Sequence, residues 1–177
     1  MRLPSNMTHD FANVPATNMP RSVFDRSHTY KTTIDADYLY PFICDFVIPG
    51  TTLNVDATIF ARLMPTVHVP LDNLWLDTFY FSVPIRLVFD NFKKMCGETV
   101  DPGDSTNYSF PTIPCTAGTG WTSGSLSDYM GLPTLVTGIS ANSLWHRAYN
   151  LIWNDWFRDQ NLQDSVVVDT DAGPTRS

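Results

Sequence analysis

Nucleophilic catalysis needs a serine, threonine or cysteine beside a histidine base, together with a group that orients the base. The sequence lacks the Gly-x-Ser-x-Gly motif that places a serine nucleophile on a sharp turn. The histidines are scattered over segments of different character, and no nucleophile, base and orienting group can be named together. These histidines are His9, His28, His68 and His146. We therefore expect no catalytic residues and a protein that is not an enzyme.

Residues that could hold a metal ion or a cofactor are also few. Asp35 and Asp37 could share one face of a strand, but a solvated strand face explains them better than a cation site. The glycine-rich residues 118–124 have neither the preceding strand nor the spacing of a phosphate-binding loop. The cysteines form no Cys-x-x-Cys pair and indicate idle thiols in a reducing compartment: Cys44, Cys96 and Cys115. We expect no cofactor and no metal.

Aromatic side chains are the strongest candidates for a binding role. Trp145, Trp153 and Trp156 lie within twelve residues of one another. They could form a platform for a sugar or a base, but aromatic residues at helical spacing more often form a core or a subunit contact. Indole rings combine a large apolar area with a polar group, as protein interfaces prefer. We therefore predict that these tryptophans lie at an assembly interface.

The overall composition is that of a folded protein that meets other protein surfaces. Of 177 residues, 43% are hydrophobic and only 16% are charged, and the net charge is −7. This negative charge argues against a protein that binds nucleic acid by long-range attraction. The sequence has no apolar run of a secretory signal or a membrane span, so we expect neither export by that route nor membrane insertion.

Hydrophobic periodicity divides the first half of the chain into an arm and a β-rich segment. Residues 1–30 show no period and predict an extended amino-terminal arm. Residues 31–96 are expected to hold the first strands, over 34–48, 53–63 and 74–83, where apolar or aromatic residues alternate or cluster. A short helix follows these strands, because Ile85, Val88, Phe89 and Phe92 recur at helical spacing before Gly97.

The second half is predicted to be loop-rich, with one strong helix. Residues 97–143 form a long loop excursion, since 16 of the 25 residues from 101 to 125 are Gly, Pro, Ser or Thr. Within it, Ser125 and Asp128 resemble a capping box for a short helix. Residues 144–160 predict an aromatic helix, with Arg147 away from its apolar stripe. Residues 161–177 look like the start of a further segment, with β structure near 165–168, so we expect an incomplete fold.

Several short segments of the sequence resemble those of one family of viral proteins. They include PRSVFDRSH at 20–28, FARL at 60–63, VPIRLVFDNF at 83–92 and PGDST at 102–106. The most specific is RAYNLIWNDWFRDQN at 147–161, preceded by GLP at 131–133. Together they resemble the major capsid proteins of the Microviridae, small single-stranded DNA bacteriophages, and in particular those of the gokushoviruses. The resemblance runs almost from end to end of the chain.

The resemblance implies a mainly β fold, the viral jelly roll, an antiparallel β-sandwich or barrel with long loop insertions and a few helices. A jelly roll needs eight strands, and the patterns here indicate three or four, so we expect the chain to be an amino-terminal portion of that fold. It also implies a structural subunit of a T=1 icosahedral capsid of sixty copies around circular single-stranded DNA. The protein would reside in the virion and be assembled in the cytoplasm of the bacterial host.

The same resemblance suggests the partners. They are further copies of the chain, other virion proteins, a small basic protein that condenses the DNA, and a host surface receptor bound through regions outside this chain. Direct contact with the DNA is expected to be limited, because the arm carries few basic residues. We place assembly contacts at six positions: Phe24, Arg26, His28, Trp145, Trp153 and Trp156.

Two other classes of protein share some of these features. A carbohydrate-binding β-sandwich module would share the strands and tryptophans, but it would not need a 30-residue arm. A glycosidase would need two carboxyl groups at a defined separation, and the sequence places no such pair. The carbohydrate-binding module remains the alternative to the capsid interpretation.

Overall fold

The computed structural model describes residues 20–115 and 117–175 of the chain. The chain divides into two units, residues 1–31 and residues 32–177. In the first unit, the described residues 20–31 are exposed and form no helix or strand. Local hydrogen bonds are present, since the Ser27 backbone N–H donates to the Asp25 carboxylate at 2.9 Å. The predicted arm covers these residues, and its first 19 residues lie outside the described part.

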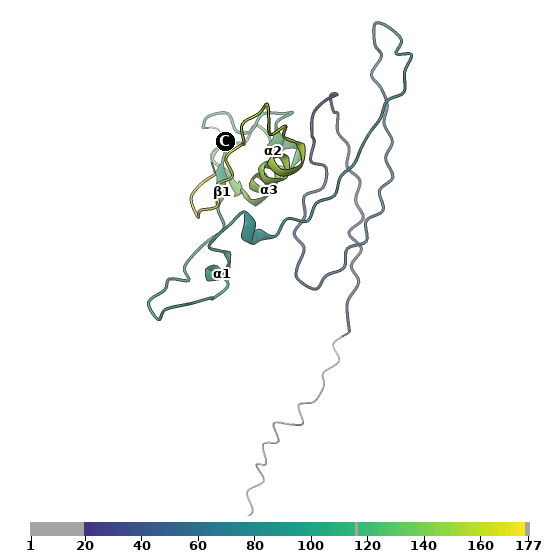
Figure 1. Cartoon of the computed structure of the whole chain (residues 1–177). Coiled ribbons are helices and arrows are strands. Elements are labelled where there is room, and N and C mark those ends of the chain that lie inside the picture. Colours follow the sequence, from purple (N-terminus) through teal and green to yellow (C-terminus); the bar gives the residue numbers. More distant parts are fainter. Residues whose placement is uncertain (1–19, 116, 176–177) are drawn as a thin grey trace, which may run out of the picture. The chain divides into compact units, whose positions relative to one another are not determined.

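The regular elements of the second unit all follow residue 84. In chain order they are the 3₁₀-helix η1 (Ile85–Leu87), α1 (Phe92–Met95), β1 (Thr112–Pro114), α2 (Leu126–Tyr129), β2 (Ser140–Asn142), α3 (Leu144–Ile152) and the π-helix η2 (Trp153–Phe157). In Figure 1 the chain from residue 32 to residue 84 is drawn as a trace without helices or arrows. The described part of the chain is therefore a small helical and β-paired region preceded by a long segment without regular structure.

The predicted strands over 34–48, 53–63 and 74–83 are not present. Alternation of apolar residues selects one face of a strand, but a strand also needs a neighbour for its backbone N–H and C=O groups. The described residues supply no such neighbour, and apolar side chains such as Val55, Ile59 and Leu63 are about half exposed, at 50%, 52% and 48%. The periodicity is real, but it did not produce sheet pairing in this structure.

The sheet that does form comes from the segment predicted to be a loop. β1 and β2 pair antiparallel, with Ile113 opposite Ala141 at the centre of the register. Ile113 is buried, and the backbone N–H of Cys115 extends the pairing to the Ile139 carbonyl at 3.0 Å. Two short strands brought together across 25 residues leave little periodic signal in the sequence, which explains why they were not predicted.

Helix predictions from local sequence agree better with the structure. The helical spacing after residue 84 becomes η1 and α1, and Gly97 ends α1 with a φ of 99° that favours glycine. Ser125 is the N-cap of α2 and accepts a hydrogen bond from the Asp128 backbone N–H at 3.4 Å, as the capping-box interpretation predicted. These signals succeed because donor, acceptor and required backbone angle lie within a few residues of one another.

A small core holds these elements together. Val88, Phe89 and Leu144 are almost fully buried, with exposed fractions of 2%, 0% and 2%. Partly buried side chains packed around them come from η1, α1 and α3 among others: Val83, Ile85, Phe92, Met95, Tyr108, Ala148 and Leu151. The core therefore joins the start of α3 to the segment after residue 82.

The π-helix changes which face the end of the aromatic helix presents. The Arg158 backbone N–H donates to the Trp153 carbonyl at 2.8 Å, five residues back, so the last turn is wider than an α-helical turn. Residues in a π turn advance by a smaller angle than in an α-helix. Trp156, one of the tryptophans predicted to lie at an assembly interface, is 72% exposed.

Residues 165–168 do not form the predicted β segment. The Asn154 side chain instead takes the place of a neighbouring strand: its amide donates to the Val166 carbonyl at 2.7 Å, and its oxygen accepts from the Val166 N–H at 2.9 Å. One side-chain amide thus satisfies both backbone groups of a residue that sequence reasoning assigned to a strand.

Candidate assembly surface

The predicted contact residues of the arm are well exposed in their own unit. Phe24 is 81% exposed, a large apolar ring in water. The His28 Nδ1 atom lies 3.0 Å from the Arg26 carbonyl oxygen, so a local turn orients the imidazole ring. Exposed apolar and cationic side chains on an arm are suited to bind a partner surface. Their use in assembly stays a prediction.

The three tryptophans of the aromatic helix contact three different neighbours and do not form one platform. The Trp145 ring stacks on Phe46 at a centroid distance of 5.3 Å and an angle of 28°. Its indole N–H is buried and has no hydrogen-bond partner among the described residues. Trp153 lines a cleft, and Trp156 lies 5.6 Å from the Phe81 ring. A flat sugar-binding face is not what this arrangement presents.

An exposed aromatic patch forms where η2 meets the segment before residue 84. We define this aromatic patch as Phe79, Phe81, Trp156 and Phe157. Phe79 and Phe81 each meet the Phe157 ring nearly edge-on, at 5.4 Å and 6.0 Å. Phe79 and Trp156 remain 53% and 72% exposed. Clustered rings that stay open to water favour a protein contact over a finished core.

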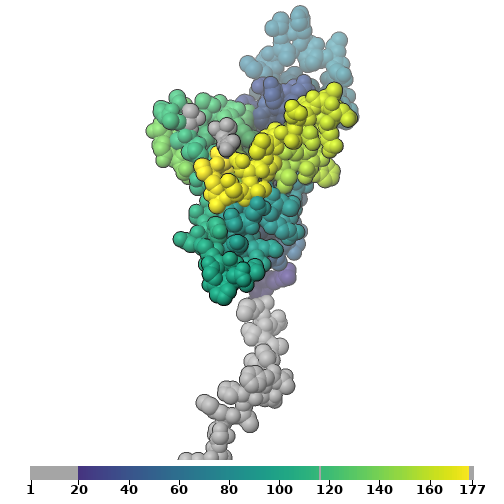
Figure 2. Space-filling view, turned by 60° about the vertical axis from the view of Figure 1, so that its left-hand side comes forward, coloured from purple at the N-terminus to yellow at the C-terminus, as the bar shows by residue number. Residues whose placement is uncertain are grey.

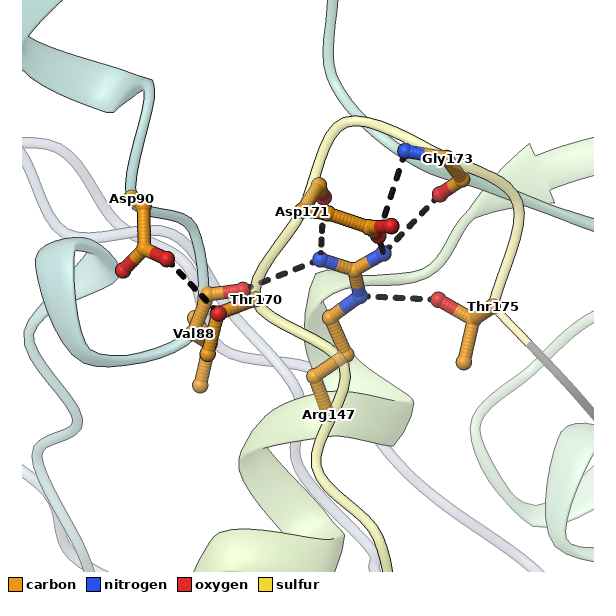
Figure 3. Close-up of polar contacts among 7 residues, drawn as sticks. All are labelled: Val88, Asp90, Arg147, Thr170, Asp171, Gly173 and Thr175. Carbon is orange, nitrogen blue, oxygen red and sulfur yellow. Dashed lines mark hydrogen bonds and ion pairs between the residues drawn. The ribbon is translucent and has the colours of Figure 1, made fainter.

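Arg147 is the residue that sequence analysis placed wrongly. It was expected away from the buried stripe of the helix, yet its exposed fraction is 0%. Figure 3 shows the guanidinium group enclosed by the C-terminal loop and by the end of η1. Its Nε donates to the Thr175 hydroxyl at 2.8 Å, and its two Nη atoms donate to three carbonyls, at 3.2 Å (Val88), 2.8 Å (Asp171) and 3.0 Å (Gly173).

The electrostatics of Arg147 are those of a structural anchor. Burial lowers the pKa of the guanidinium group, and the carboxylates of Asp169 and Asp171 act in the opposite direction. The ion pair with Asp171 is long, 3.7 Å, and that carboxylate is 78% exposed, so hydrogen bonds to carbonyls dominate the interaction. Four hydrogen-bond acceptors, one at residue 88 and three within residues 171–175, surround the guanidinium group. Because they are distant from Arg147 in the sequence, no local sequence pattern could have predicted them.

A second contact fastens the same C-terminal loop. The Asp90 backbone N–H donates to the Thr170 carbonyl at 3.0 Å, and the Thr170 hydroxyl donates to the Asp90 carboxylate at 2.7 Å. In Figure 2 the yellow C-terminal residues lie on the surface next to teal residues from the middle of the chain. The loop is therefore tied at both ends to the region around the core.

One serine and one histidine lie within hydrogen-bond reach. The Ser127 hydroxyl is 3.0 Å from the His146 Nε2 atom, and this contact joins α2 to α3. Both side chains are buried, at 7% and 6% exposure, and burial lowers the pKa of His146. The His146 Nδ1 atom has no partner among the described residues, so the group that would orient a catalytic base is missing there. The pair is suited to connect two helices.

A metal site, a membrane-spanning helix and paired cysteines are all absent from the described part of the chain. Within residues 20–115 and 117–175, no three His, Cys, Asp or Glu side chains come together to hold a metal ion. No helix in the same residues combines the length and apolarity needed to cross a bilayer. The cysteines Cys44, Cys96 and Cys115 are free thiols, and burial raises the pKa of Cys44.

Comparisons with known proteins point to one class. Residues 12–176 match the family described as "Capsid protein (F protein)". The chain is 44% identical over 166 residues to the capsid protein VP1 of Bdellovibrio phage phiMH2K, covering 94% of this chain and 31% of the relative. It is 44% identical over 180 residues to capsid protein VP1 of Chlamydia phage 1, covering 98% and 30%, and 35% identical over 165 residues to that of Spiroplasma virus 4, covering 93% and 30%. The chain thus spans about a third of the length of these relatives.

Proposed function

Because the chain belongs to the phage family of F capsid proteins, we propose that it is part of a structural subunit of a bacteriophage capsid and has no catalytic role. The observation that carries this proposal is the family match over nearly the whole described chain, together with high identity to three proteins named capsid protein VP1. The exposed apolar side chains of the chain support the same role.

The segment from residue 34 to residue 83 is rich in apolar side chains and mostly exposed. It holds large side chains that are more than half exposed, among them Phe60 at 91%, Leu71 at 97% and Trp75 at 86%. Each large apolar side chain that becomes buried contributes about 1.5–3 kcal/mol. We propose that this segment is covered by other parts of the capsid, and that the complete subunit is a viral jelly roll.

The finer features of the particle belong to the same proposal. Sixty copies form a T=1 icosahedral shell around circular single-stranded DNA, in a virion assembled in the cytoplasm of the bacterial host. A small basic protein condenses the DNA, other virion proteins complete the particle, and regions outside this chain bind the host receptor. The net charge of −7 supports this division of roles, since the chain itself offers little attraction for phosphate.

Assembly contacts are proposed at the arm and at the aromatic helix. In the arm they involve Phe24, Arg26 and His28, which are exposed in their unit. In the helix they involve Trp145, Trp153 and Trp156, of which Trp156 is the most exposed, within the aromatic patch. Aromatic side chains of this kind supply much of the binding energy of protein interfaces.

Expression of the reading frame that encodes this chain in a bacterial host, followed by electron microscopy, tests the proposal. We expect closed shells of uniform size. Trp156→Ser should reduce the yield of shells, whereas Leu162→Ser, at a position that is 83% exposed and outside the aromatic patch, should not. A soluble monomer that forms no shells and binds sugars would overturn the capsid proposal and favour a carbohydrate-binding module.

A further inference from the structure

Residues 105–145 carry almost no charge. Charged residues make up 16% of the whole chain, but this stretch of 41 residues holds a single one, Asp128. The Asp128 carboxylate accepts a hydrogen bond from the Gly124 backbone N–H at 2.8 Å, so the one charge is already hydrogen-bonded within the stretch. We call residues 105–145 the neutral segment. Its surface offers a charged partner little attraction and little repulsion.

Most large apolar side chains of the neutral segment are already packed. The segment contains the paired strands β1 and β2 and the capped helix α2, and its Trp121 and Met130 side chains are both only 7% exposed. Among its described residues from 111 to 145, only two large apolar side chains are left exposed, Leu135 at 70% and Val136 at 43%. We call these two residues the tip. A packed region with a two-residue apolar tip differs from the long apolar segment before η1, which exposes many large side chains.

The tip is held in one conformation by its own backbone. The Leu135 N–H donates to the Trp121 carbonyl at 2.9 Å, and Thr134 forms an isolated β-bridge with the same tryptophan. On the other side, a Cβ at Gly120 would lie 2.5 Å from the Val136 carbonyl oxygen, so only glycine allows these two backbones to come so close. The tip is therefore fixed against a buried tryptophan before any partner binds.

Leu135 has an unfavourable backbone conformation as well as an exposed side chain. Its φ is 59°, and among the described non-glycine residues only Asp37 also has a positive φ. Aspartate tolerates the left-handed region, whereas the Cβ of leucine is crowded there. Neither the backbone nor burial within this chain favours leucine at this position. Strained residues that the surrounding structure holds in place are typical of binding sites.

We propose that the tip contacts a second copy of this chain, as a preformed apolar contact between capsid subunits. Copies with a net charge of −7 repel one another, so contact is favoured where their surface is neutral. A basic partner would instead be matched by carboxylates, and the neutral segment has only that of Asp128. Because the tip is already rigid, it loses little conformational entropy when it is buried. The inference rests on the proposed capsid role, which supplies the second copy, and it adds a contact to the six positions proposed above.

Leu135→Asn, in the complete polypeptide encoded by the reading frame, separates this contact from folding. Asparagine adopts the left-handed backbone more readily than leucine and has little apolar surface. We expect the free subunit to unfold at the same or a higher temperature. The concentration of free subunit that coexists with shells should nevertheless rise at least about tenfold, as expected for the loss of one buried leucine. The matched control is Leu162→Asn, at a position that is 83% exposed and outside the neutral segment, which should change neither quantity.

Photo-cross-linking identifies the partner directly. With a benzophenone amino acid in place of Val136, a mixture of isotopically heavy and light subunits should give products that join one heavy chain to one light chain. A cross-link only within one copy, a cross-link to a different protein, no cross-link, or an unchanged free-subunit concentration in Leu135→Asn would overturn the proposal. Cross-links between copies without any shells would refute the capsid role and leave the contact in place, so the two failures are distinguishable.

Discussion

Replacing Arg147 by Met tests whether one buried cation holds the C-terminal loop. Methionine keeps most of the apolar volume of the side chain but removes all of its N–H donors. Four hydrogen bonds would be lost, to Val88, Asp171, Gly173 and Thr175. We expect the loop to open more often, because methionine offers these acceptors no side-chain donor in place of the guanidinium group.

The size of the effect follows from the burial of the acceptors. Hydrogen bonds from a charged donor contribute about 1.5–3 kcal/mol each, but they are not additive. The hydrogen bonds to the carbonyls of Asp171 and Gly173 are only partly buried, so these two acceptors can regain water. The hydrogen bonds to the Val88 carbonyl and to the Thr175 hydroxyl are buried. Loss of the two buried hydrogen bonds alone therefore costs about 3 kcal/mol or more. At 1.4 kcal/mol per factor of ten, this corresponds to about 100-fold or more in local opening.

Hydrogen exchange measures this opening at two backbone amides. The Thr175 N–H donates to the Thr112 carbonyl at 2.9 Å, and the Asp90 N–H donates to the Thr170 carbonyl at 3.0 Å. In Arg147→Met both amides should exchange about 100-fold faster, or reach the rate of an unprotected amide. Arg86→Met is the control, since Arg86 is exposed. Unchanged exchange in Arg147→Met, or equal acceleration in the control, would refute the anchoring role.

Two further substitutions test close packing and buried titration. Gly120→Ala should destabilise the chain by several kcal/mol more than Gly118→Ala in thermal unfolding. Both glycines have a positive φ, so the backbone strain of an alanine is similar at the two positions. A Cβ at Gly120 would lie 2.5 Å from the Val136 carbonyl oxygen, whereas a Cβ at Gly118 would have no atom within 4 Å. Equal losses of stability in the two variants would contradict the close packing at Gly120. Stability should also fall as the pH drops below about 6.5, the ordinary pKa of histidine, because burial lowers the pKa of His146 and the unfolded chain binds the proton more tightly. Denaturant unfolding across this range should show a weaker pH dependence in His146→Gln but not in the exposed His68→Gln, and identical profiles would contradict the assignment.

The long apolar segment shows how far periodicity alone can go. Its alternating residues predicted strands over 34–48, 53–63 and 74–83, and the described chain has none there. The pattern encodes a face to be buried, and it does not encode the partner that pairs with the backbone. Phe79 and Phe81, which would share one face of the predicted strand, remain 53% and 37% exposed, so the described residues do not fully cover that face.

Sequence by itself determined the features whose partners lie close together along the chain. The cap of α2 needs only Ser125 and Asp128, and the end of α1 needs only the backbone freedom of Gly97. The family was also recognisable from short sequence segments such as residues 147–161, and the comparisons confirmed it.

Tertiary structure alone decided the rest. The segment 147–161 contains Arg147, whose side chain is buried by residues that lie 24 to 28 positions later and 59 positions earlier in the chain. The cleft likewise joins Asp37 to Trp153, and the Asn154 amide pairs with Val166 in place of a strand. Contacts between distant residues depend on how the whole chain folds, because loop closure and burial are settled over the complete structure and leave no fixed spacing in the sequence.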